Sequence, residues 1–144
     1  MNIIVVGVDG SPGAEQAIRF AAREAAAHGA TLRLVSAWVI PTSVLASGGV
    51  GADMYRSFET EAREIVHDAA ASAAAVEPAI VIEEATVEGH AGNVLVKEAE
   101  RADLVVLGRR GHGGLSELLL GSVSHQVADH ARCPVVIVPP AAVE

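Results

Sequence analysis

The sequence predicts a doubly wound α/β domain, in which helices cover both faces of a five-stranded parallel sheet. Short apolar runs alternate with helical patterns along the chain, and most of these runs are continuously hydrophobic. Continuous runs are typical of parallel strands that are buried on both faces. At 144 residues the chain has the length of one domain, and we expect residues 1–144 to form it. A TIM barrel would need a longer chain.

The first strand is expected over residues 3–8, and the helix that follows it has a clear start. Ser11 is expected to be its N-cap and Pro12 its first helical residue. Gly29 is a natural stop for this helix. The apolar residues that recur at helical spacing predict its buried face, which consists of Ala14, Ala17, Ile18, Ala21, Ala22 and Ala25.

The remaining elements are assigned in the same way from their apolar patterns. Further strands are expected over residues 31–39, 79–87, 103–108 and 134–139, and further helices over residues 53–76, 93–101 and 123–131. Residues 40–52 are rich in Gly and Ser and are expected to form a loop. The apolar stripe of the long helix consists of Tyr55, Phe58, Ala62, Ile65, Ala69 and Ala73.

Charge and composition argue against several classes of partner. The formal net charge is −8 and Lys97 is the only lysine, so we expect no nucleic-acid surface, which needs clustered basic residues. Cys133 is the only cysteine, so no disulfide can form within the chain. No apolar run reaches the roughly 18 residues that span a bilayer, and no signal segment is recognised. We therefore expect a cytoplasmic protein without a membrane partner.

The stretch GRRGHGGLSELLLGS, residues 108–122, suggests a binding site for an anion. Glycine lets the backbone approach a ligand closely, and the N-terminus of the helix expected near Val123 attracts phosphate. The phosphate-loop pattern and the dinucleotide-binding pattern are both absent. From the residues alone, a simple turn in which Ser122 is the helix N-cap remains an alternative to an anion site.

The spacing of this stretch carries a family resemblance. Gly108, Gly111, Gly121 and Ser122 match the pattern G-x2-G-x9-G-[S/T], and the segments VGVDGS and GSVSHQVADHARCPVVIVP match as well. The whole chain thereby resembles the universal stress protein family, in its ATP-binding branch. The resemblance implies an adenine nucleotide alpha hydrolase-like fold with strand order 3-2-1-4-5. It also implies a homodimer that binds ATP with little or no catalysis.

The resemblance assigns roles around the nucleotide. The phosphates and ribose would be held by Gly108, Gly111, Gly121, Ser122 and Ser124. The adenine would be lined by Ala37 and Leu107, and the nucleotide would be bordered by Arg110, His112 and Val123. Asp9, which ends the first strand, would accept hydrogen bonds from the ribose or the adenine.

General rules for open sheets agree with the implied position of the site. In such sheets, ligands bind at the carboxyl ends of the strands where the strand order reverses. In the implied order this point lies between the first and fourth strands, which end at Asp9 and Gly108. Asp9 would repel a triphosphate, so we expect it at the sugar end, and the alternative is that it caps the turn beside Ser11. ATP is expected with Mg²⁺ or Mn²⁺, held mainly by phosphate oxygens and water.

Two functions remain open at this point, and a dimeric scaffold with an unused nucleotide site is a third, reserve interpretation. The first is a nucleotide-dependent regulatory protein in the stress response, with little or no catalysis. The alternative is a slow ATPase or a phosphoryl or adenylyl transferase, which needs a carboxylate for the metal and a positioned base. Asp9 and His112 are the nearest candidates for these two roles.

The fifth strand is the expected dimer interface. In the implied order the third and fifth strands are the edges of the sheet, and Glu83 and Glu84 blunt the third against pairing. These two glutamates are adjacent in a strand, so we expect them on opposite faces. The fifth strand carries no charge and consists of Val135, Val136, Ile137 and Val138. A second copy related by a two-fold axis would cover it.

Overall fold

A computed structural model of the chain describes residues 1–49, 51–109 and 120–141. The strands of these residues form one parallel sheet in the order β3-β2-β1-β4-β5. The sheet consists of β1 (Ile3–Gly7), β2 (Thr31–Trp38), β3 (Ile82–Glu88), β4 (Leu104–Gly108) and β5 (Val135–Val138). The predicted fold class and strand order are both confirmed.

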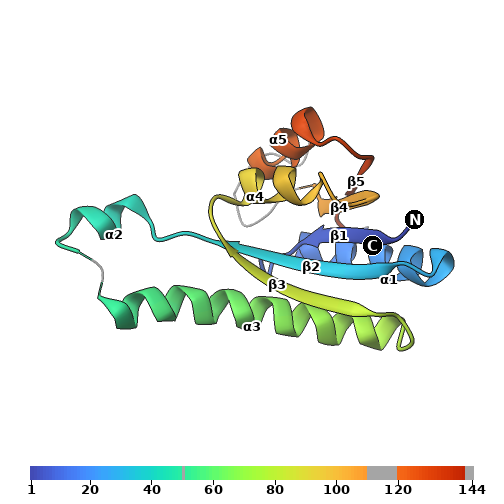
Figure 1. The fold of residues 1–144 in the computed structure, drawn as a ribbon, viewed down its shortest axis with the longest axis horizontal. Coiled ribbons are helices and arrows are strands. Elements are labelled where there is room, and N and C mark those ends of the chain that lie inside the picture. The colour runs from blue at the N-terminus through green and yellow to red at the C-terminus, as the bar shows by residue number, and fades with distance from the viewer. Residues whose placement is uncertain (50, 110–119, 142–144) are drawn as a thin grey trace.

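Helices cover both faces of the sheet (Figure 1). One face packs against α1 (Pro12–His28) and α3 (Ala52–Val76), and the other against α4 (Ala91–Glu98) and α5 (Ser122–His130). Each face has its own buried cluster, which we name the α1/α3 core and the α4/α5 core. Val6 belongs to the first and Val5 to the second, so alternate residues of β1 supply both cores. Burial on both faces explains why this strand is apolar at every position.

Helix α1 begins and ends where the sequence predicts. Ser11 is the N-cap, and its Oγ accepts a hydrogen bond from the Ala14 N–H at 3.2 Å. Gly29 ends the helix in the left-handed conformation with φ of 67°. The six residues of the predicted apolar face are all buried, namely Ala14, Ala17, Ile18, Ala21, Ala22 and Ala25.

The structure corrects the long connection after β2. Residues 40–52 do not form only a loop, because the short helix α2 (Thr42–Ala46) starts after Pro41. None of its residues is buried, so no apolar pattern marks it in the sequence. Figure 1 shows α2 projecting beyond the carboxyl end of the sheet, next to the start of α3. Within the described residues, no helix combines the length and the apolar character needed to cross a membrane.

Several expected boundaries also shift by a few residues. β1 ends at Gly7 rather than at residue 8. β3 begins at Ile82 rather than at residue 79, because the chain first makes a turn in which the Ile80 N–H bonds to the Glu77 carbonyl at 3.4 Å. α4 occupies residues 91–98 instead of 93–101, and it ends in tighter turns after Glu98.

The apolar stripe of α3 is confirmed in part. Ala62, Ala69 and Ala73 are buried, whereas the expected core position of Tyr55 is wrong, since this residue is 37% exposed. Tyr55 packs edge-on against Trp38 with ring centroids 4.8 Å apart, and its hydroxyl donates to Glu88 at 2.6 Å. Val66 is buried and was not part of the predicted stripe. Ile65 is partly buried and packs against the same core.

The two edge glutamates point to opposite faces of β3, as predicted. Glu83 lies 3.5 Å from Arg33, which also pairs with Glu98 of α4 at 2.8 Å. Glu84 lies 3.4 Å from His67 of α3 on the other face. Both carboxylates therefore occupy an edge of the sheet, which discourages pairing with another strand.

Candidate functional site

The candidate site lies where the neighbouring strands β1 and β4 end. Val6 pairs with Val106 in parallel register, so the two strands end side by side. From this point β2 and β3 extend the sheet to one side and β5 extends it to the other. The strand order therefore reverses here, which makes this edge the expected place for a ligand.

Gly108, the first glycine of the motif, is in close backbone contact with α1. A Cβ atom at residue 108 would lie 2.7 Å from both the carbonyl carbon and the carbonyl oxygen of Gly13. Such a contact is too short for any side chain, so the packing of α1 against β4 requires glycine at this position. Sequence reasoning missed the part played by Gly13. The one available indication was a glycine within the first turn of a helix, which lowers helix stability and needs a packing reason.

Two hydrogen bonds hold the start of α5 against the end of β4. The Gly121 N–H donates to the Arg109 carbonyl at 2.8 Å, and the Ser124 Oγ–H donates to the Gly108 carbonyl at 2.7 Å. Gly108 and Gly121 are thereby brought together although they are far apart in the sequence. Ser124 is only 4% exposed, so its hydroxyl serves to anchor the helix.

The first turn of α5 presents backbone N–H groups at the same place. Gly121 is the N-cap, with φ of −66° and ψ of 162°, and provides no side-chain hydrogen bond to the helix. The alternative in which Ser122 caps the helix is therefore wrong, since Ser122 is its first helical residue. Within the described part of the chain, no side chain accepts from the N–H groups of Ser122, Val123 or Ser124. These groups carry partial positive charge and can hold an anion.

Asp9 lies in the turn between β1 and α1. Its Oδ1 accepts the Ser11 N–H at 2.9 Å, so the local capping role that was the alternative for Asp9 is present in the structure. This bond orients the carboxylate within the turn that precedes α1. A carboxylate accepts several hydrogen bonds, and the capping bond is therefore compatible with contact to a ligand hydroxyl.

The other predicted site residues separate into two groups. Ala37, Leu107 and Val123 all pack into the α4/α5 core, on the same face of the sheet. Leu107 is 4% exposed, whereas Ala37 and Val123 are only partly buried. The predicted residues Arg110, Gly111 and His112 lie outside the described residues.

The described residues supply no ready-made metal centre. Within residues 1–49, 51–109 and 120–141, no group of three or more His, Cys, Asp or Glu side chains is positioned to bind a metal ion. A divalent ion at this site would therefore take other ligands, of which phosphate oxygens and water are the usual ones for Mg²⁺.

Comparison with known sequences places the chain in a family. The sequence profile described as the universal stress protein family matches residues 1–139. The universal stress protein Rv1996 of Mycobacterium tuberculosis is 34% identical over 152 residues, which cover 94% of this chain and 47% of that protein. The universal stress protein Rv2623 of the same organism is 34% identical over 134 residues, covering 93% of this chain and 44% of that protein. The chain spans about half the length of the curated relatives it matches.

Solved structures of nearly equal length share the fold. A universal stress protein crystallised in complex with cAMP is 31% identical, with a TM-score of 0.76 over 97% of this chain and 98% of that chain. A universal stress protein from Archaeoglobus fulgidus in complex with dAMP is 25% identical, with a TM-score of 0.69 over 95% of this chain and 97% of that chain. The sheet order, the profile match and the identities agree, and the chain belongs to the universal stress protein family.

Proposed function

We propose that this chain binds an adenine nucleotide across the carboxyl ends of β1 and β4, with ATP as its ligand. In this proposal it acts as a nucleotide-dependent regulatory protein with little or no catalysis. The observation that carries the proposal is the meeting of Gly108, Gly121 and the first turn of α5 at the point where the strand order reverses. Backbone N–H groups of a helix start are suited to phosphate.

The relatives with bound ligands support the adenine part of the proposal. One contains cAMP and another contains dAMP, and both ligands combine adenine, a pentose and one phosphate. The preference for a triphosphate is the finer part of the proposal. Its support is the pair of arginines in the sequence at residues 109 and 110, which can offset additional phosphate charge.

Each residue at the site has a distinct role in this proposal. Ser122 and Val123 offer backbone N–H groups to phosphate, and Gly121 keeps the approach to them open. Ser124 acts through its own N–H and by fixing α5 to β4, since its hydroxyl is used by the Gly108 carbonyl. Asp9 accepts a hydrogen bond from the ribose while its Oδ1 orients the turn through Ser11.

The decisive experiment replaces Gly121 with valine. A branched side chain there would obstruct the phosphate, and calorimetric titration should lose the ATP signal while the circular dichroism spectrum stays native. Gly51→Val is a matched control, because Gly51 is also an N-cap, with φ of −73° and ψ of 164°, and has open space around it. ATP affinity that is equal in Gly121→Val and wild type would refute the assignment.

A divalent ion should strengthen ATP binding. Phosphate oxygens and water would supply most of its ligands, and the ion would offset the charge of the triphosphate. Titration of ATP with excess Mg²⁺ and again with a chelator should show weaker binding in the second case. Equal affinities would contradict a role for Mg²⁺ or Mn²⁺.

We also propose a homodimer through β5. This strand lies at an edge of the sheet, its four residues are each only partly buried, and none carries a charge. The opposite edge, β3, exposes Glu83 and Glu84 instead. An uncharged apolar edge is prone to pairing, and an antiparallel β5 from a second copy would satisfy it.

A further inference from the structure

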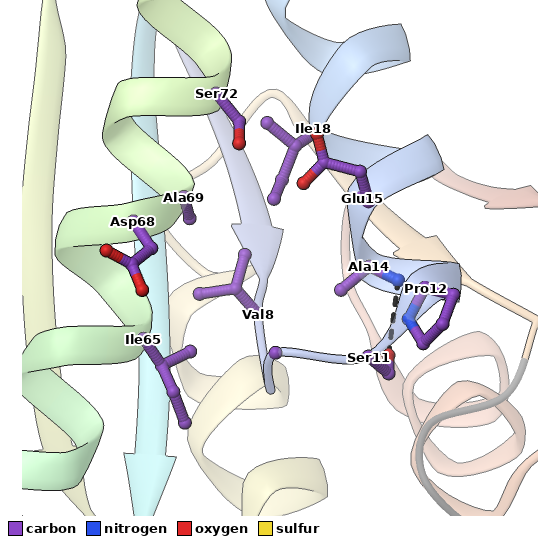
Figure 2. Close-up of a pocket in the computed structure, with 11 residues that line it drawn as sticks. Val8, Ser11, Pro12, Ala14, Glu15, Ile18, Ile65, Asp68, Ala69 and Ser72 are labelled. Carbon is purple, nitrogen blue, oxygen red and sulfur yellow. Dashed lines mark hydrogen bonds between the residues drawn. The ribbon is translucent and has the colours of Figure 1, made fainter.

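A second concave site lies on the opposite side of the molecule from α4 and α5. It is a groove of about 290 Å³ between α1 and α3, closed at one end by the turn after β1. This volume is just below the range for ligand pockets, which begins at about 300 Å³. We name it the α1–α3 groove, and Figure 2 shows the side chains that line it.

The floor of the α1–α3 groove is apolar. Val8 and Ile18 are 5% and 3% exposed, and Ile65 of α3 contributes a partly buried side chain. In Figure 2 these side chains converge from the end of β1 and from both helices. A ligand that enters the groove must therefore present an apolar body to this floor.

The rim of the groove carries negative charge. Glu15 of α1 and Asp68 of α3 line it, and no lysine or arginine does. Glu15 forms an exposed ion pair with Arg19 at 3.6 Å. Within the described residues, Asp68 has neither an ion-pair nor a hydrogen-bond partner.

A hydroxyl completes the polar part of the rim. Figure 2 shows the Glu15 carboxylate beside Ile18, on the side of α1 that faces Ser72 of α3. The Ser72 hydroxyl and the Glu15 carboxylate are acceptors of the kind that an ammonium group requires, since such a group has three donors and no acceptor. The two charged side chains that line the groove are both carboxylates, so they disfavour an anion.

We propose that the α1–α3 groove binds a small organic cation, an ammonium group attached to a compact apolar body. The apolar part would lie on Val8, Ile18 and Ile65, and the ammonium would bond to Glu15 and Ser72, while Asp68 adds a second negative charge to the rim. The negative charge of the rim favours a positively charged ligand, and the volume of the groove limits the ligand to about the size of an arylalkylamine. The proposal does not depend on nucleotide binding, because the groove and the start of α5 lie on different faces of the sheet.

The test is a titration followed by NMR of isoleucine methyl groups, with 2-phenylethylamine as the probe and without nucleotide. We expect the methyl signals of Ile18 and Ile65 to shift and to show magnetisation transfer from the phenyl protons. The neutral analogue 2-phenylethanol should bind about tenfold more weakly, because it lacks the charged donor and loses one charge-assisted hydrogen bond. The anionic analogue 3-phenylpropanoate should cause no shift. Equal affinity for amine and alcohol would overturn the proposal.

Variants locate the site. Glu15→Gln should weaken amine binding by about tenfold, whereas Glu100→Gln, which removes one exposed charge from the turn after α4, should leave it unchanged. Ser72→Leu should abolish binding because its side chain fills the groove. An equal loss in Glu15→Gln and Glu100→Gln would show only general attraction to an acidic protein and would refute the site. If Ser72→Leu does not fold, the magnetisation transfer to Ile18 and Ile65 in wild type still decides the location.

Discussion

The contact between Gly108 and Gly13 makes a quantitative prediction for Gly108→Ala. The added Cβ would lie 2.7 Å from two backbone atoms of Gly13, whereas ordinary contact begins at 3.4 Å. The first turn of α1 and the end of β4 must therefore separate by about 0.7 Å. Neither partner can rotate away, because both are backbone. Overpacking costs about 1–3 kcal/mol, and we expect the upper part of this range, about 2–3 kcal/mol.

This loss of stability is measurable by urea unfolding and by thermal unfolding. A destabilisation of this size lowers the melting temperature of a domain of this length by about 5–10 °C. Gly51→Ala is the control, since a Cβ at residue 51 has nothing within 4 Å and its φ is −73°. The control should stay within about 0.5 kcal/mol of wild type. A Gly108→Ala protein with the urea midpoint of wild type would refute the reasoning.

Three further predictions concern pH, assembly and catalysis. The N–H groups of Asn2 and Ile3 donate to Asp103 Oδ2 at 2.7 and 2.9 Å and hold the pKa of Asp103 below its usual value. The stability that these two hydrogen bonds contribute is therefore present above about pH 4 and is lost as the pH falls through the folded pKa of Asp103. Asp103→Asn should accordingly lower the urea midpoint at pH 7 but not near pH 2. Equal midpoints at pH 7 would contradict this. Val136→Lys should give monomeric or insoluble protein in sedimentation analysis, and a wild type that sediments as a monomer at micromolar concentration would exclude the β5 interface. ATP turnover should be slow or absent in wild type and in Asp9→Asn alike, whereas turnover of about 1–100 per second that Asp9→Asn abolishes would favour the enzyme alternative.

Local patterns in the sequence were sufficient for most of the fold. Helix α1 shows why, since Ser11, Pro12 and Gly29 mark its ends and the alanine spacing identifies its buried face. These features act between residues that are close along the chain. A helix without buried residues leaves no apolar periodicity in the sequence, and the exposed helix α2 was therefore not predicted. Tyr55 was misplaced for a related reason, because α3 extends past the sheet and an apolar stripe does not reveal where the sheet ends.

The sequence by itself determined the chemistry available at the candidate site, since the glycine spacing of residues 108–122 and Asp9 after the first strand are visible without coordinates. Only the tertiary structure decided what these residues touch. Gly108 is required by the backbone of Gly13, and the hydroxyl of Ser124 is used by a carbonyl of β4. The groove between α1 and α3 likewise joins Glu15 to Asp68 and Ser72. Such contacts depend on how helices are placed on the sheet, and no spacing along a single element encodes that placement.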